Sequence, residues 1–108
     1  MTNSCNKGKN GEREFAAKLR EWGFTSARRG QQHAGGNDSP DVRCEELSDI
    51  HFEVKRVQAG NPYGWLAQAK RDAGENKIPV VAHRRNRQDW IAVLSMDDLL
   101  NLLHLRGN

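Results

Sequence analysis

The sequence predicts a single α/β domain in which helices flank a central mixed β-sheet. The chain has 108 residues, a length that suits one compact domain. Apolar residues recur at helical spacing in some segments and at strand spacing in others, and these segments follow one another along the chain. Because no internal repeat and no linker separates two halves, we expect one domain over residues 1–108.

The first third of the chain predicts a helix, a short strand and a loop. Residues 1–9 are polar, and we expect them to be flexible. Asn10 can cap a helix that ends at Gly23, and residues 24–28 fit a short strand. Residues 29–40 are rich in Gly, Asn and Ser and predict a loop. The apolar face of the helix comprises Phe15, Ala16, Leu19 and Trp22.

The middle of the chain predicts two strands and a second helix. Residues 41–44 and 50–57 fit adjacent strands that an acidic turn joins. Pro62 suits the first position of a helix, so we expect this helix to begin after Asn61 and to run to about Ala73.

The last third of the chain predicts two further strands and a third helix. The strands, residues 77–83 and 89–94, enclose a basic turn. Ser95 and Asp98 form a capping box that begins an amphipathic helix. The leucines of this helix suit either the core or the surface of a partner, and we favour the core. They are Leu99, Leu100, Leu102 and Leu103. The complete order is α-β-β-β-α-β-β-α.

The composition favours a polyanionic partner and excludes several classes of protein. The formal net charge is +3, and the Lys and Arg residues are clustered. The two cysteines and four histidines show no close ligand spacing, which argues against a structural zinc site. No apolar run approaches the ~18 residues of a membrane span, and the N-terminus does not resemble a signal peptide. We therefore expect a reduced, cytoplasmic protein without a membrane partner.

One predicted strand carries charged residues between apolar ones. Side chains alternate along a strand, so Phe52 and Val54 share one face while Glu53 and Lys55 share the other. On an exposed face, this would be an ordinary surface ion pair worth at most ~1 kcal/mol. Asp41 makes that interpretation less favourable, because a hairpin would bring it alongside Glu53.

The expected closeness of Asp41 and Glu53 points to a cation. Two carboxylates held together repel each other unless a positive charge lies between them. A hard divalent cation with oxygen ligands is the simplest solution, and Mg²⁺ keeps several waters for chemistry. Lys55 beside the cation can stabilise or orient an attacking water. This arrangement predicts metal-assisted hydrolysis of a phosphodiester.

Glu12 offers a third carboxylate, on the apolar stripe of the first predicted helix. An acid in the first turn of a helix commonly complements the helix dipole. A carboxylate on an apolar stripe also fits a role at the site, because burying an unpaired charge is costly. The sequence leaves both interpretations open.

Four segments in this order resemble the PD-(D/E)xK nuclease superfamily: "GEREF", "SPDV", "FEVKR" and "QAKRDAG". Within the superfamily, the chain is similar to archaeal-type Holliday-junction resolvases and their small phage-encoded relatives, over about residues 7–94. The resemblance implies a restriction-endonuclease-like core. It also implies a structure-selective DNA endonuclease that uses Mg²⁺, which Mn²⁺ can replace, in the cytoplasm of the host if a phage encodes it.

The resemblance implies a role for each residue of the motif. Asp41 and Glu53 would bind the metal directly, and the backbone carbonyl of Val54 would add a further ligand. Lys55 would be the catalytic lysine. Glu12 would assist through metal-bound water.

The helix after the motif carries a further candidate residue. Gln68 resembles the glutamine that faces the active site in many of these nucleases, although an ordinary surface residue is an equal alternative. Asp72 follows one turn later, and we interpret it as structural.

The loop before the Pro-Asp motif departs from the pattern of the archaeal resolvases. These enzymes place a serine there, whereas this chain has Ala34 at the corresponding place. Gln31, Gln32 or His33 could serve instead. The departure puts junction selectivity in doubt more than nuclease identity.

A nuclease needs basic residues around its carboxylates to bring the DNA backbone close. For each such residue, an ordinary solvated position is an equal alternative. The predicted DNA contacts are Lys7, Lys9, Arg28, Arg29, Gln31 and Arg56.

A four-way junction needs two symmetrically placed cuts, so we expect a homodimer that binds branched or duplex DNA. One alternative is a less selective nicking or restriction-like nuclease on the same scaffold. Another is a catalytically silent nucleic-acid-binding module, which the full set of Glu12, Asp41, Glu53 and Lys55 argues against.

Overall fold

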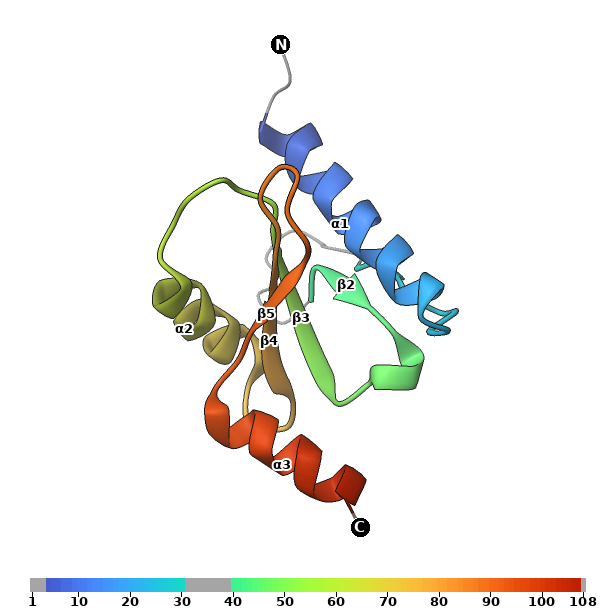
Figure 1. Ribbon diagram of the computed structural model, residues 1–108, viewed down its shortest axis with the longest axis vertical. Helices are drawn as coiled ribbons and strands as arrows, with labels where there is room; N and C mark the ends of the chain where they lie inside the picture. Colours follow the sequence, from blue (N-terminus) through green and yellow to red (C-terminus); the bar gives the residue numbers. More distant parts are fainter. Residues whose placement is uncertain (1–3, 31–39, 108) are drawn as a thin grey trace.

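The structure, a computed structural model, describes residues 4–30 and 40–107, and these form one mixed sheet with helices on both faces (Figure 1). The strands are β1 (Arg28–Arg29), β2 (Val42–Arg43), β3 (Ile50–Lys55), β4 (Ile78–His83) and β5 (Ile91–Val93). The helices are α1 (Ser4–Glu21), α2 (Pro62–Ala73) and α3 (Met96–Gly107). Neighbouring strands are antiparallel except β3 and β4, which are parallel because α2 connects them as a crossover helix. The predicted order of elements and the α/β fold class are confirmed.

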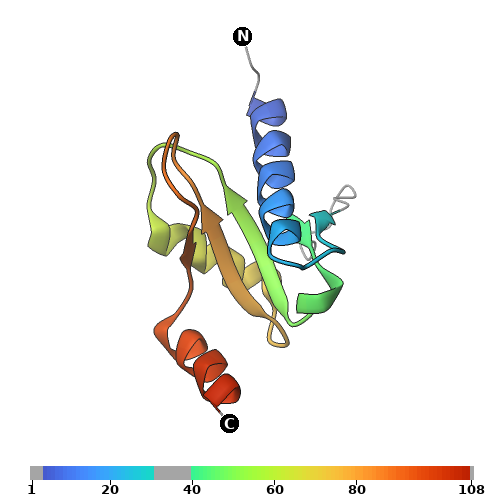
Figure 2. The same cartoon turned by 45° about the vertical axis from the view of Figure 1, so that its right-hand side comes forward.

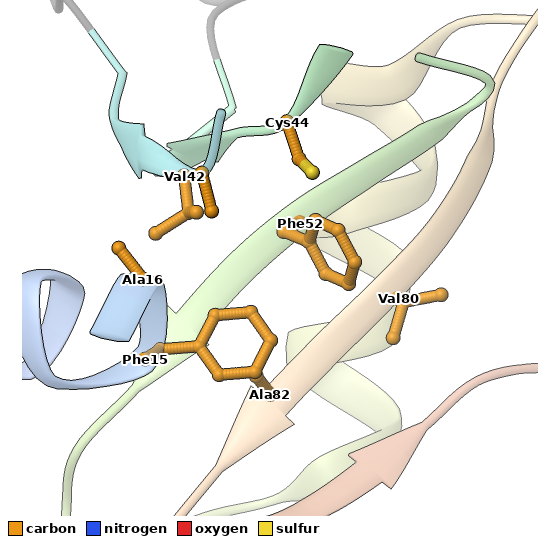
Figure 3. Close-up of a cluster of buried hydrophobic side chains, with 8 residues drawn as sticks. Phe15, Ala16, Val42, Cys44, Phe52, Val80 and Ala82 are labelled. Carbon is orange, nitrogen blue, oxygen red and sulfur yellow. The ribbon is translucent and has the colours of Figure 1, made fainter. Parts of the chain in front are cut away.

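The core lies between α1 and one face of the sheet (Figure 3). The ring of Phe15 meets Phe52 edge-on, with ring centres 5.2 Å apart. α2 covers the opposite face, as two views of the molecule show (Figures 1 and 2). Because side chains alternate along a strand, the polar side chains of β3 face α2. The buried cluster on the α1 side comprises Phe15, Ala16, Ala27, Val42, Cys44, Phe52, Val80 and Ala82.

The predicted start of the first helix is wrong. α1 begins at Ser4, so residues 4–9, which we expected to be flexible, form its first turns. Asn10 lies on the exposed surface of the helix, where its side-chain oxygen accepts a long hydrogen bond of 3.5 Å from Arg13. The helix also continues through Gly11, because α1 packs closely there: a Cβ on Gly11 would lie 2.6 Å from the Cβ of Arg56. This glycine permits close packing and does not end the helix.

The predicted place of Trp22 in the core is also wrong, because 72% of this residue is exposed. The chain reverses at Gly23, which has a φ of 97°. The N–H of Phe24 donates to the carbonyl oxygen of Leu19 at 3.0 Å. This bond closes the turn, so Phe24, and not Trp22, packs against the core.

The first strand is shorter than predicted. We expected residues 24–28, but β1 comprises only Arg28–Arg29. The N–H of Ala27 donates to the carbonyl oxygen of Phe24 at 3.1 Å, so the preceding residues form a turn. The acidic turn between the next two strands contains a short 3-10 helix, Glu45–Leu47.

The second helix matches its prediction. α2 spans Pro62–Ala73, and the side-chain oxygen of Asn61 caps it by accepting a 3.0 Å hydrogen bond from the N–H of Tyr63. Gly74 ends it with a φ of 72°.

The third helix forms as predicted, but its leucines do not fill the core. The hydroxyl of Ser95 accepts a 3.2 Å hydrogen bond from the N–H of Asp98, which confirms the cap. α3 lies beyond one end of the sheet in both views (Figures 1 and 2), so Leu100 and Leu103 remain about half exposed. Neither α3 nor any other helix of the described residues is long and apolar enough to cross a membrane.

Candidate active site

The charged side chains of β3 lie on the sheet face that α2 covers. His51 and Glu53 are 0% and 8% exposed, and Lys55 is half-buried. An ordinary surface ion pair between Glu53 and Lys55 would require an exposed face. Because Glu53 is buried, this interpretation does not hold. Charged groups are costly to bury unless they are paired or bind an ion. This part of the sheet is therefore a candidate site for chemistry.

Asp41 lies opposite Glu53, as the predicted hairpin requires. Val42 pairs with Phe52 in the antiparallel ladder, so the residue before Val42 faces the residue after Phe52. The N–H of Asp41 donates to the carbonyl oxygen of Phe52 at 2.9 Å. In turn, the N–H of Val54 donates to Oδ2 of Asp41 at 2.8 Å. These two bonds hold the Asp41 carboxylate against β3.

The environment of Asp41 favours its protonated form. Burial raises the pKa of Asp41 to about 7, and the neighbouring carboxylate of Glu53 also raises it. The N–H of Val54 and the ammonium of Lys55 act in the opposite direction. Two partly desolvated carboxylates this close need a proton or a cation between them. The oxygen-rich pair therefore fits a hard divalent cation such as Mg²⁺, with Asp41 and Glu53 as its ligands.

Glu12 lies two turns inside α1, so it is not the first-turn acid that would complement the helix dipole. Its carboxylate pairs with Nε of Arg29 at 2.9 Å, and 15% of its side chain is exposed. Burial raises the pKa of Glu12, the hydrogen bond from Arg29 lowers it, and the charge of Asp41 raises it. Because the charge of Asp41 affects the pKa of Glu12, the two carboxylates lie close enough to interact electrostatically.

Two residues next to Glu53 were not among the predicted site residues. Nε2 of His51 lies 2.8 Å from Oε1 of Glu53. Asp72 on α2, which we had interpreted as structural, places a carboxylate oxygen within 4.8 Å of the ligand atoms of both residues. Gln68, one turn earlier on α2, is exposed, whereas Asp72 is half-buried. His51 and Glu53 are two positions apart on β3, so their side chains share a face of the sheet. This spacing was the signal that could have revealed the histidine.

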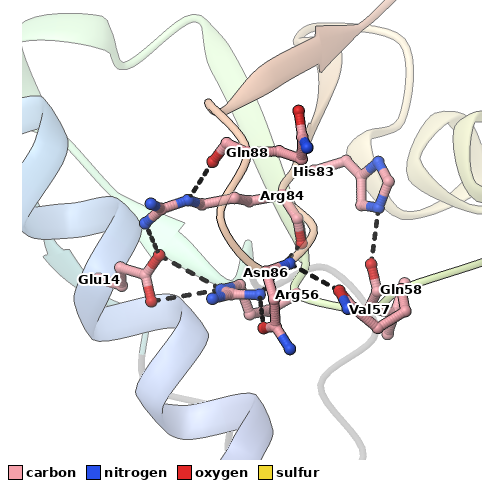
Figure 4. Close-up of polar contacts among 8 residues, drawn as sticks. All are labelled: Glu14, Arg56, Val57, Gln58, His83, Arg84, Asn86 and Gln88. Atoms are coloured by element: carbon pink, nitrogen blue, oxygen red, sulfur yellow. Dashed lines mark hydrogen bonds and ion pairs between the residues drawn. The ribbon is translucent and has the colours of Figure 1, made fainter.

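Two of the arginines predicted to contact DNA are held in ion pairs. Nε of Arg56 lies 3.3 Å from Glu14 on α1, and the same carboxylate also binds Arg84 (Figure 4). Arg29 is paired with Glu12. These pairs reduce the positive charge that Arg29 and Arg56 present to a DNA backbone.

The other predicted DNA contacts divide into two groups. Lys9 and Arg28 are exposed, and the Arg28 guanidinium makes long contacts, 3.9 Å to Glu45 and 3.5 Å to the carbonyl oxygen of Ser26. Gln31 lies outside the described residues, as do His33 and Ala34 of the same loop and the side chain of Lys7.

The comparisons with known proteins agree with this geometry. Residues 3–106 match the protein family described as "Phage putative PDDEXK endonuclease". The match includes the β2–β3 hairpin with Asp41 and Glu53, and all of α2. Searches of the curated proteins and of the solved structures found no match. Because the match covers nearly the whole chain, the resemblance to PD-(D/E)xK nucleases is confirmed, and the chain belongs to this family of phage PDDEXK endonucleases.

Proposed function

We propose that this endonuclease cuts DNA in a Mg²⁺-dependent, structure-selective manner, as a Holliday-junction resolvase that acts as a homodimer. PD-(D/E)xK nucleases act on DNA and generally use divalent metals, so the family supports the reaction class. The observation that carries the metal assignment is the Asp41–Glu53 pair. Its two carboxylates are held together on a largely buried sheet face, where burial raises the pKa of Asp41 to about 7.

Each residue of the pair would contribute in a defined way. Asp41 and Glu53 would hold the cation through carboxylate oxygens, with the carbonyl of Val54 as a further ligand. Bound Mg²⁺ supplies Lewis-acid polarisation of the phosphate and a more acidic water. The ammonium of Lys55 would stabilise the negative charge that develops on the phosphate during attack. Glu12, oriented by Arg29, would accept a hydrogen bond from a water next to the pair.

The proposed substrate selectivity and homodimer depend on the symmetry of the junction and on the exposed surfaces of the protein. A junction cut in two symmetric places requires two copies of the site, which a two-fold homodimer supplies. The exposed leucines of α3 offer an apolar surface for such an assembly. Lys9 and Arg28 are exposed and can contact phosphates. Gln68 on α2 is exposed and stays a predicted active-site residue.

A cleavage assay on a panel of synthetic DNAs tests the proposal. The panel comprises a four-way junction, a flap and a linear duplex at equal salt, each with Mg²⁺ or with EDTA. We expect paired symmetric nicks in the junction, far faster than cleavage of the duplex, and none with EDTA. Asp41→Asn should abolish cleavage while junction binding persists.

The other outcomes separate the alternatives. Equal cleavage of duplex and junction would contradict the resolvase assignment and favour a less selective nuclease. Binding of DNA without cleavage by the wild-type protein, in Mg²⁺ and in Mn²⁺, would favour the silent binding module.

A further inference from the structure

We infer that His51 is a positioning residue that fixes the carboxylate of Glu53 through a hydrogen bond from its ring. The inference rests on the proposed function, because Glu53 is placed there as a metal ligand. It assigns a role to a residue outside the Asp41, Glu53 and Lys55 set.

The contact between the two side chains is short and enclosed. Nε2 of His51 lies 2.8 Å from Oε1 of Glu53, and the side chains are 1% and 11% exposed. The residues are two positions apart on β3, so both project from the same face of the sheet. A fully buried ring cannot swing away into solvent. His51 therefore limits the orientations that the Glu53 carboxylate can adopt.

Hydrogen-bond accounting sets the direction of this bond. An ionised carboxylate only accepts hydrogen bonds, so Nε2 of His51 must carry the proton. Nδ1 of His51 is buried and has no hydrogen-bond partner among the described residues. A proton on Nδ1 would be buried without an acceptor, which is costly. The ring therefore carries its proton on Nε2, which donates to Oε1 of Glu53.

This bond has a consequence for the cation. With Oε1 engaged by His51, the Glu53 carboxylate would present Oε2 more freely to a cation that Asp41 also holds. Asp72 adds a further carboxylate within 4.8 Å of the ligand atoms of His51 and Glu53. Like charges repel, so without the His51 donor the Glu53 carboxylate would turn away from Asp72 and from its working orientation.

The chain contains a matched control for this histidine. His83 ends β4 and is also buried, with 8% exposed. It pairs with Lys55 across the parallel strands, so it lies on the same face of the sheet. Its Nε2, however, lies 2.9 Å from the backbone carbonyl of Val57 and not from a carboxylate. Removing the His83 bond should affect stability alone.

The experiment compares His51→Phe, His51→Gln and His83→Phe. Phenylalanine keeps a ring but has no donor, whereas glutamine keeps an N–H donor with similar reach. Titration calorimetry with Mn²⁺ gives metal affinity, and cleavage of a four-way junction gives kcat and KM. We expect His51→Phe to weaken Mn²⁺ binding by about 10- to 100-fold and to lower kcat without raising KM for DNA. His51→Gln should restore much of both, and His83→Phe, which removes the bond to Val57, should lower only Tm.

Three results would overturn the inference. In the first, His51→Phe binds Mn²⁺ and cuts like the wild type, or loses only thermal stability, as His83→Phe does. In the second, Mn²⁺ binding persists in Asp41→Asn but disappears when His51→Gln is added, which would make the ring itself a ligand. In the third, wild-type protein neither binds Mn²⁺ nor cuts DNA, and the proposed function then fails as well. Should His51→Phe not fold, His51→Asn replaces it, because its shorter amide falls short of Glu53.

Discussion

At the scale of single residues, Asp41 links the stability of the protein to its chemistry. The N–H of Val54 and strand pairing hold its carboxylate beside Glu53. The fold therefore stabilises an arrangement that is unfavourable for two bare carboxylates. Binding of a cation, or of a proton, relieves this repulsion.

The first prediction concerns the pH dependence of stability without metal. Burial and Glu53 raise the pKa of Asp41 in the folded state to about 7, against an ordinary value of 3.8. Between these values the folded state binds more protons than the unfolded state, so stability falls as pH rises through this window. Thermal unfolding in EDTA should show Tm decreasing from pH 4 to pH 7 or above.

The control for this prediction is Asp41→Asn, which cannot ionise. Its Tm should change less than that of the wild type over the same pH range. Adding Mg²⁺ above pH 7 should raise the Tm of the wild type and leave that of the variant unchanged. A wild-type Tm that rises steadily with pH in EDTA would contradict the assigned environment of Asp41.

The second prediction concerns Lys55. Its proposed role is to stabilise charge during attack, so Lys55→Ala should lower kcat by about 10²- to 10³-fold. Mn²⁺ affinity should stay close to that of the wild type, because the ammonium is not a ligand. Lys55→Arg should not restore activity, since the guanidinium is wider and differently placed. A loss of Mn²⁺ affinity as large as that of Asp41→Asn would refute the role.

Part of the candidate site could be predicted from the pattern of residues in the sequence. The alternation of side chains along β3 and one expected hairpin were enough to predict that Asp41, Glu53 and Lys55 lie close together. Both of these are local properties of the chain. The neighbourhood of Asp72 depends on how α2 packs over β3, and no local pattern specifies that packing. Gln68, for which the sequence left an active-site and an ordinary surface position equally open, is exposed, whereas Asp72 is half-buried.

At the scale of helices and strands, local sequence signals correctly predicted the helix ends that depend on nearby residues. The Asn61 cap, the Gly74 end of α2 and the Ser95 cap of α3 all act within a few residues. The start of α1 and the exposure of Trp22 instead depend on close packing at Gly11 and on the chain reversal at Gly23. The contact at Gly11 with Arg56 is tertiary, and the local signal at Asn10 misled. The reversal at Gly23 is local, because a hydrogen bond from Phe24 to Leu19 closes it.

The third prediction tests the packing of α1. A Cβ at Gly11 would lie 2.6 Å from the Cβ of Arg56, so Gly11→Ala should push α1 away from β3 and cost about 1–3 kcal/mol. Gly8 lies in the same helix with nothing within 4 Å of a Cβ. Gly8→Ala should therefore stabilise the protein by up to about 1 kcal/mol through helix propensity. Urea unfolding of both variants measures the difference, and equal effects would show that the Gly11 contact is unimportant.

At the scale of the whole molecule, α3 is the element that the fold leaves uncovered. A 12-residue helix is marginal in water unless it packs on something. Leu100 and Leu103 lie about half exposed on this helix, beyond the end of the sheet (Figure 2). Its first turn is acidic, with Asp97 and Asp98, and its last turn is basic. Antiparallel packing of two such helices across a two-fold axis would bring opposite charges together.

The last prediction tests this assembly and its link to substrate choice. The double variant Leu100→Glu/Leu103→Glu places charges on the apolar surface of α3. It should therefore convert the dimer into a monomer, which analytical ultracentrifugation would detect. Asn101→Glu adds a charge to an exposed position of the same helix without removing a leucine, so it should remain dimeric. The forced monomer should still bind Mn²⁺, because Asp41 and Glu53 lie within one chain. It should, however, lose its preference for the four-way junction over linear duplex, since fitting two strands at once needs two sites. A wild-type monomer that still cuts junctions in symmetric pairs would show that selectivity arises within one subunit.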